Sequence, residues 1–163
     1  MTEWWQPLVG VALGWTLGQT SEWWRQRYRA RQRRAAIYVE LRDVHSIVKT
    51  RVLILNELLK RFVLDRLIED YPADIPYPIF KAHFADVVLK FSESERLALM
   101  HIYGLIDGLN ANFSIMRSNW DTMSGDEPLN NENLRKAIQV GQGAYTNARV
   151  ADVMIGLLLQ ERQ

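Results

Sequence analysis

Residues 19–71 form a stretch of the chain that favours helix at every position, because these 53 residues contain neither glycine nor proline. Apolar side chains recur within it every three or four positions, which is the spacing of one face of an α-helix. They are Ile37, Leu41, Val44, Val48, Val52, Leu55, Leu59 and Phe62. We therefore expect one long helix that runs into the core of a helical domain without a hinge.

The segment from Trp4 to Trp24 has the features of a membrane-spanning helix. Two tryptophan pairs bracket it, and between Pro7 and Gly18 only Thr16 is polar. The pairs are Trp4-Trp5 and Trp23-Trp24. The 21 residues would extend about 31 Å as a helix, close to the hydrocarbon thickness of a bilayer. Indole rings favour the headgroup boundary, so both pairs are predicted to anchor a transmembrane helix within residues 1–34.

The strictly apolar run is short, twelve residues, and polar side chains crowd both its ends. A run of that length also suits a core helix or the apolar region of a signal peptide. No Lys or Arg precedes the run and no small-residue cleavage site follows it, which argues against a cleaved signal. Bulky apolar residues surround the whole helix, which argues against a soluble core helix. A signal anchor is favoured, with an amphipathic or soluble helix as the alternative.

Six arginines follow the predicted span and set its expected orientation: Arg25, Arg27, Arg29, Arg31, Arg33 and Arg34. Positive flanks remain in the cytoplasm, so we expect a single-pass protein of the inner (plasma) membrane with its N-terminus outside and residues 35–163 inside as a cytoplasmic helical domain. The arginines spread around the helix, which favours anionic lipid headgroups over a nucleic-acid groove. Binding of nucleic acid, with Trp23, Trp24 and Tyr28 stacking on bases, is the alternative if there is no span.

Three glycines within the predicted span, Gly10, Gly14 and Gly18, recur at every fourth residue. This spacing places them along one ridge of a helix, where two helix backbones can approach closely. The ridge predicts a homo-oligomer. The alternative is that the spacing is accidental, since glycine is common in spanning helices.

The rest of the chain also has helical patterns separated by clear breaks. Three prolines between Tyr71 and Pro78 stop the long helix and predict an extended, exposed connector. A short helix is expected from Ile79 to Phe91. Ser92 and Glu95 form a capping box that starts the next helix.

That next helix is predicted to reach Trp120, with Leu99, Tyr103, Ile106 and Phe113 facing inward. The polar stretch 122–133 follows as a loop, and a last helix from Leu134 to Leu159 closes the bundle. The predicted fold class is therefore all-α, an N-terminal transmembrane helix that continues into a cytoplasmic bundle of about four helices.

In this layout the chain resembles small uncharacterised bacterial single-span, membrane-anchored helical proteins, with an arginine-rich helix after the span, a proline-containing linker and a helix similar to LALMHIYGLIDGLN. It also resembles, in layout alone, membrane effectors of bacterial antiviral systems, in which a cytosolic sensor controls an oligomeric membrane segment. Neither resemblance supplies a catalytic residue or a ligand.

The chemistry-bearing residues do not form a recognisable catalytic, cofactor or metal motif. None of His45, His83 and His101 follows a carboxylate by three residues, and there is no cysteine. Glu40 and Asp43 are expected on a solvated helix face, with His45 pointing elsewhere. His83 and His101 are expected to be partly buried and hydrogen-bonded.

We therefore expect a non-enzymatic, membrane-anchored interaction or sensor module without a cofactor, whose cytoplasmic domain binds a protein or a small ligand. The alternative is an oligomeric, membrane-perturbing or pore-forming effector. Bulk charge does not predict a polyanion partner for the domain, since residues 35–163 hold 14 basic and 17 acidic groups.

Overall fold

The structure, a computed structural model, describes residues 5–63, 71–123 and 131–161, and every regular element in these ranges is a helix. In chain order they are α1 (Trp5–Val63), α2 (Pro78–Val87), the 3₁₀ helix η1 (Val88–Lys90), α3 (Glu93–Met123) and α4 (Asn131–Gln160). The all-α prediction of about four helices is confirmed. The predicted loop 122–133 is too long at both ends, since residues 122–123 belong to α3 and residues 131–133 to α4, and its remaining residues, 124–130, lie outside the described ranges.

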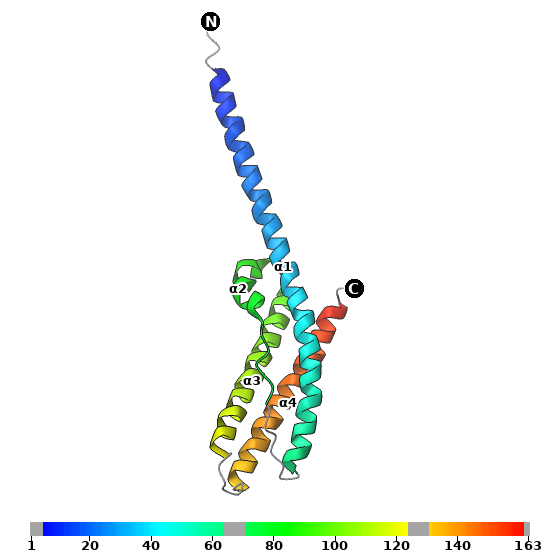
Figure 1. Cartoon of the computed structure of the whole chain (residues 1–163). Helices are drawn as coiled ribbons and strands as arrows, with labels where there is room; N and C mark the ends of the chain where they lie inside the picture. Colours follow the sequence, from blue (N-terminus) through cyan, green and yellow to red (C-terminus); the bar gives the residue numbers. More distant parts are fainter. Residues whose placement is uncertain (1–4, 64–70, 124–130, 162–163) are drawn as a thin grey trace.

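Helix α1 has 59 residues, which corresponds to a length of about 88 Å at the helical rise. Its C-terminal half packs into the bundle, whereas its N-terminal half extends beyond the other helices (Figure 1). We call residues 5–29 the arm. The expectation that one helix enters the domain without a hinge is confirmed, because no residue between 19 and 63 interrupts the helical backbone.

The prediction that this helix spans a membrane is not supported by its composition. Within the described ranges, no helix is both long enough and apolar enough to cross a bilayer. The physical reason lies in the sequence of the arm, where the apolar run from Pro7 to Gly18 would extend only about 18 Å before Gln19 and Glu22 follow.

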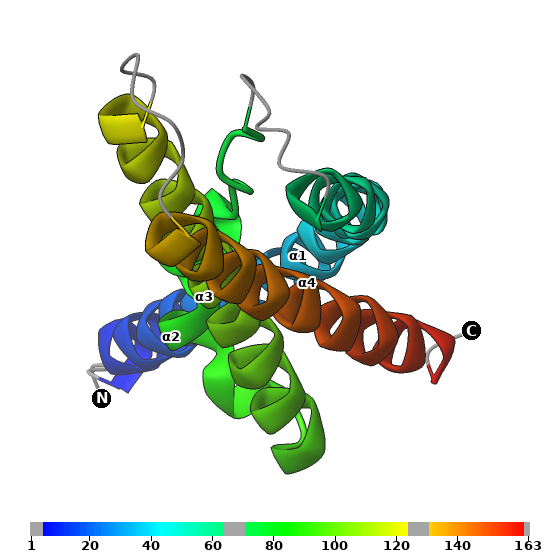
Figure 2. The ribbon, with the colours of Figure 1, turned by 90° about the horizontal axis from the view of Figure 1, so that it is seen from below.

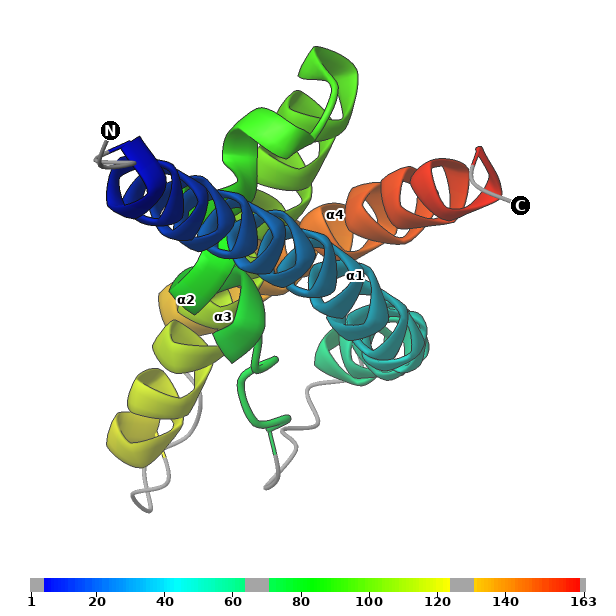
Figure 3. The same cartoon turned by 90° about the horizontal axis from the view of Figure 1, so that it is seen from above.

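The bundle core forms where α4 packs against both α1 and α3, as the two end views show (Figures 2 and 3). Small side chains on α4, Ala144, Ala148 and Ala151, are fully buried there and let the helices approach closely. The expected inward faces are largely confirmed. Fully buried positions include Ile37, Leu41, Val48, Leu55, Leu99, Ile106, Phe113 and Ile155.

The connector before α2 differs in part from its prediction, because Ala73, Asp74 and Pro76 are exposed as expected but two large apolar side chains are buried. Ile75 is 1% exposed and Tyr77 is 4% exposed. Asn110 of α3 holds both backbone groups of Ile75, accepting its N–H at 2.8 Å and donating to its carbonyl at 3.1 Å. Arg117 donates to the Pro72 carbonyl at 2.9 Å. Side chains of α3 thus satisfy backbone groups that have no helical partner in this extended connector.

The start of α3 agrees with the sequence. The Ser92 hydroxyl accepts the Glu95 N–H at 3.2 Å, and the Glu95 carboxylate accepts the Ser92 N–H at 2.8 Å. This reciprocal pair is the predicted capping box. Glu95 therefore has a fixed position, which matters because it also binds Arg34 and Tyr38 in the part of α1 that follows the arm, residues 30–38, here called the base of the arm.

Candidate functional site

The arm exposes large apolar side chains along several helical turns. The exposed fraction is 71% for Val11, 67% for Trp15 and 65% for Trp24. Trp23 and Trp24 also contact each other edge to face, with ring centroids 5.8 Å apart. Isolated apolar residues are normal on a protein surface, but several exposed tryptophans along one helix are typical of a surface that contacts a membrane or another protein.

The predicted glycine ridge lies on this arm. Gly14 and Gly18 are exposed, and a Cβ atom added at either would meet nothing within 4 Å in the single chain. Gly10 lies in the same helix. Of the other predicted anchors, Trp5 begins α1 and Trp4 lies outside the described residues.

The six predicted arginines divide into two groups. Four are exposed on the arm or at its end: Arg25, Arg27, Arg29 and Arg31. Arg33 instead forms an ion pair with Asp86 of α2, at 2.7 Å. Arg34 donates to both carboxylate oxygens of Glu95 at 3.0 Å, and Tyr38 donates to the same carboxylate at 2.9 Å. The last two arginines therefore attach the base of the arm to the bundle.

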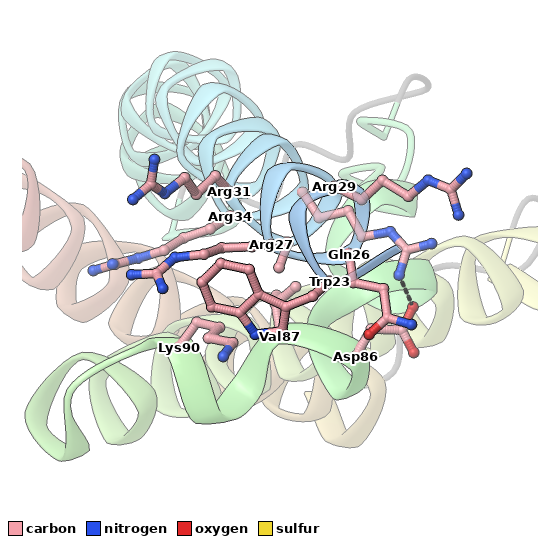
Figure 4. A pocket seen from close by; sticks show the side chains of 11 residues that line it. Trp23, Gln26, Arg27, Arg29, Arg31, Arg34, Asp86, Val87 and Lys90 are labelled. Atoms are coloured by element: carbon pink, nitrogen blue, oxygen red, sulfur yellow. Dashed lines mark hydrogen bonds and ion pairs between the residues drawn. The ribbon is translucent and has the colours of Figure 1, made fainter. Parts of the chain in front are cut away.

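A pocket of about 630 Å³ opens where the arm meets α2 and η1 (Figure 4). Six of its side chains are basic and one is acidic. Its lining residues are Trp23, Gln26, Arg27, Arg29, Ala30, Arg31, Arg33, Arg34, Asp86, Val87 and Lys90. The sequence predicts the arginines of this site but not the pocket, since Asp86 and Lys90 come from a part of the chain more than 50 residues away.

One face of α1 forms a wall of this pocket. Trp23, Arg27, Ala30 and Arg34 follow one another at steps of four, three and four residues, so they line one side of the helix. The Arg27 guanidinium lies over the Trp23 ring, 5.1 Å from its centroid. Small Ala30 is half-buried and packs against the core, which leaves room between the two larger side chains.

Glu40 is a buried polar residue, so the prediction that it lies on a solvated helix face is wrong. It is only 6% exposed. Its carboxylate accepts the backbone N–H groups of Ile79 and Phe80, at 2.6 and 2.8 Å, and the Tyr103 hydroxyl at 3.2 Å. The first turn of α2 thus receives its acceptor from another helix, at the end where the helix dipole favours negative charge.

The surroundings of Glu40 also keep Tyr103 in its neutral form. Burial, and then the charge and hydrogen bond of Glu40, raise the pKa of Tyr103 well above its ordinary value. The Phe80 ring stacks on Tyr103 with centroids 3.7 Å apart. These contacts seat α2 against α1 and α3, and so position Asp86 and Lys90 beside the arm.

The histidines do not come together. His45 pairs with Asp152 of α4 at 3.0 Å, His83 is half-buried, and His101 is exposed, so the expected burial of His101 is wrong. Across the described ranges, no three residues of the types that bind metals lie close enough to hold an ion.

Comparisons with protein-family models, with curated proteins and with solved structures give no match to this chain. A functional hypothesis for it therefore rests on the arm, the pocket and the bundle themselves.

Proposed function

We propose that the chain is a non-enzymatic, membrane-anchored interaction or sensor module. Its arm enters a lipid bilayer, and its bundle binds a protein or a small ligand in the cytoplasm. The observation that carries this proposal is the exposure of Val11, Trp15 and Trp24 on a helix that extends beyond its own domain.

The energy available for insertion is substantial. A fully buried tryptophan removes about 150–250 Å² from water, so covering the exposed part of Trp15 or Trp24 contributes roughly 2–4 kcal/mol each at about 25 cal/mol per Å². Each arginine near an anionic surface adds up to about 1 kcal/mol. Arg25, Arg27, Arg29 and Arg31 are the exposed cations placed for this contact.

The proposal includes the single-pass orientation expected from charge, with the N-terminus outside the inner (plasma) membrane. A short apolar run is accommodated when the bilayer thins locally and flanking side chains reach the interface, each at a modest cost per ångström. A cysteine placed at Thr2 and labelled by an impermeant reagent on intact cells tests this orientation. Labelling only after lysis would indicate the opposite orientation, with the N-terminus in the cytoplasm.

Vesicle flotation with matched variants tests the anchoring itself. Trp15→Glu places a charge in the arm, whereas Leu53→Glu places the same charge at a 69% exposed apolar residue of the bundle. A charge at the centre of a membrane helix costs about 2.5–3.5 kcal/mol, so we expect Trp15→Glu to lower the affinity for vesicles, measured by flotation, roughly 100-fold. Leu53→Glu should float like the parent. Equal flotation of both variants would exclude the arm as the anchor.

An oligomeric membrane-perturbing or pore-forming effector is the second candidate. The observation that favours it is the uncovered ridge at Gly14 and Gly18. Release of a trapped dye from vesicles, by the parent but not by Gly14→Leu, would distinguish an effector from a simple anchor. Nucleic acid is not the expected partner, because the exposed arginines point to several sides of the helix.

A further inference from the structure

The geometry points to a discrete binding site for a phosphate-bearing anion in the pocket between α1 and η1, with Arg27, Arg31 and Lys90 as its available cations. For a lipid headgroup as the source of the phosphate, the inference rests on the proposed membrane function. For a free phosphate-bearing ligand it does not.

The first argument is the state of the cations. Arg33 is neutralised by Asp86 and Arg34 by Glu95. Within the described ranges, no carboxylate lies within ion-pairing distance of Arg27, Arg31 or Lys90. The exposed cations of the pocket therefore repel one another until an anion enters, and an anion that does so gains several charge-assisted hydrogen bonds.

The second argument is the arrangement of the cations. Figure 4 shows Arg27, Trp23 and Lys90 at one end of the pocket, while Arg29 extends away from them. Arg27 is held over the Trp23 ring. Lys90 comes from η1, so cations on two separate elements face a shared space. This differs from a solvated helix face, where all charges belong to one helix.

The third argument concerns which anion fits. Guanidinium groups donate two parallel hydrogen bonds to phosphate oxygens, and several of them suit a group with more than one charge. A volume of about 630 Å³ accommodates a phosphate with its attached glycerol or sugar. The indole of Trp23 and buried Val87 supply an apolar wall for the attached carbon atoms. Asp86 disfavours a ligand that enters with its negative charge near α2.

The site also has a mechanical consequence. One wall of the site is the base of the arm, and the other is α2, which carries Asp86. Glu40 holds α2 against α1 by accepting the N–H groups of Ile79 and Phe80, and Tyr103 stacks on the Phe80 ring. An anion bound between them adds contacts from both walls. Occupancy therefore holds α2 and η1 more firmly against α1 where the arm begins.

The test measures protection of the Lys90 amine from acetylation, read by mass spectrometry, with the exposed Lys49 amine as the internal reference. The full chain is titrated with inorganic pyrophosphate, both in buffer and in neutral phosphatidylcholine discs. In a second titration, the discs contain phosphatidic acid and no pyrophosphate is added. We expect selective protection of Lys90. Protection by pyrophosphate identifies a free phosphate ligand, and protection only by phosphatidic acid identifies a headgroup.

Two variants with the same charge change compare the affinity for pyrophosphate by isothermal titration calorimetry, because Lys90→Glu lacks the amine that is acetylated. Lys90→Glu should weaken binding about tenfold or more, the effect of losing one charge-assisted hydrogen bond. Lys49→Glu should not change it. Both keep all six arginines, so both should still float with vesicles. Equal affinities for the two variants, or no protection of Lys90 by either probe, would overturn the inference. Failure of the parent to float would instead contradict the membrane proposal, and the titration in buffer would still test the pocket.

Discussion

Replacing Glu40 by glutamine tests how α2 is held on the bundle. The carboxylate accepts two backbone N–H groups at the start of α2 and the hydroxyl of Tyr103. A glutamine side chain offers one oxygen and one NH₂ group in their place. One of the two N–H groups, that of Ile79 or that of Phe80, then faces another donor.

The expected cost follows from these contacts. A hydrogen bond to a charged group contributes about 1.5–3 kcal/mol, and of the three bonds to Glu40 the variant loses at least one and weakens the others. Loss of the negative charge at the N-terminus of α2 adds a few tenths to about 1 kcal/mol. We therefore expect Glu40→Gln to destabilise the fold by about 3 kcal/mol, which lowers the melting temperature by roughly 10 °C for a chain of this size.

Two measurements check this value in the full chain. Thermal unfolding followed by circular dichroism gives the melting temperature, and amide hydrogen exchange of the peptide with Ile79 and Phe80 gives the local effect. Exchange there should accelerate about 100-fold. Glu57→Gln is the matched control, because Glu57 is exposed and its ion pair within the described part of the chain is with Lys60 one turn away. A Glu40→Gln protein that melts and exchanges like this control would refute the reasoning.

Two further predictions concern the same region. Because folding raises the pKa of Tyr103, the contribution of its neutral form to stability is complete below about pH 10 and is lost as the pH rises above that value. Between about pH 8 and pH 11 the melting temperature should therefore fall more steeply with pH for the parent than for Tyr103→Phe. Asn110→Ala leaves both backbone groups of Ile75 without their partner, which costs about 1–3 kcal/mol of stability, and should make residues 71–77 the earliest site of limited proteolysis. Ser114→Ala, at an exposed position of α3, is the control, and cleavage of residues 71–77 at the same rate in both variants would contradict the role of Asn110.

The features predictable from the sequence are those encoded within a few residues. The capping box pairs Ser92 with Glu95, three positions apart, and the uninterrupted helix from residue 19 to Val63 lies in a stretch without glycine or proline. The inward faces follow from the helical period. Each of these needs no knowledge of which helix packs where.

The features missed depend on residues that meet only in the fold. Glu40 is polar and one helical turn from Asp43, which is typical of a solvated face. It becomes a buried acceptor only because the fold packs Ile79, 39 residues later in the chain, against it. The connector is similar, since its prolines indicate exposure until Asn110 satisfies Ile75 across 35 residues. The pocket needs Lys90 and Arg27 to line one cavity, an arrangement that no local pattern encodes.

The glycine ridge of the arm gives the most direct test of self-association. In the single chain nothing lies within 4 Å of a Cβ atom added at Gly14, so Gly14→Leu is compatible with the monomer. In a pair of arms packed along the ridge, the same leucine would stand where the two backbones meet and would force them apart. Val11→Leu is the control, because Val11 is exposed and lies about 100° around the helix from Gly10. Crosslinking in membranes should give an oligomer for the parent and for Val11→Leu, and mainly monomer for Gly14→Leu. Equal crosslinking of all three proteins would mean that the glycines do not form an interface, and would remove the main physical argument for an oligomeric effector.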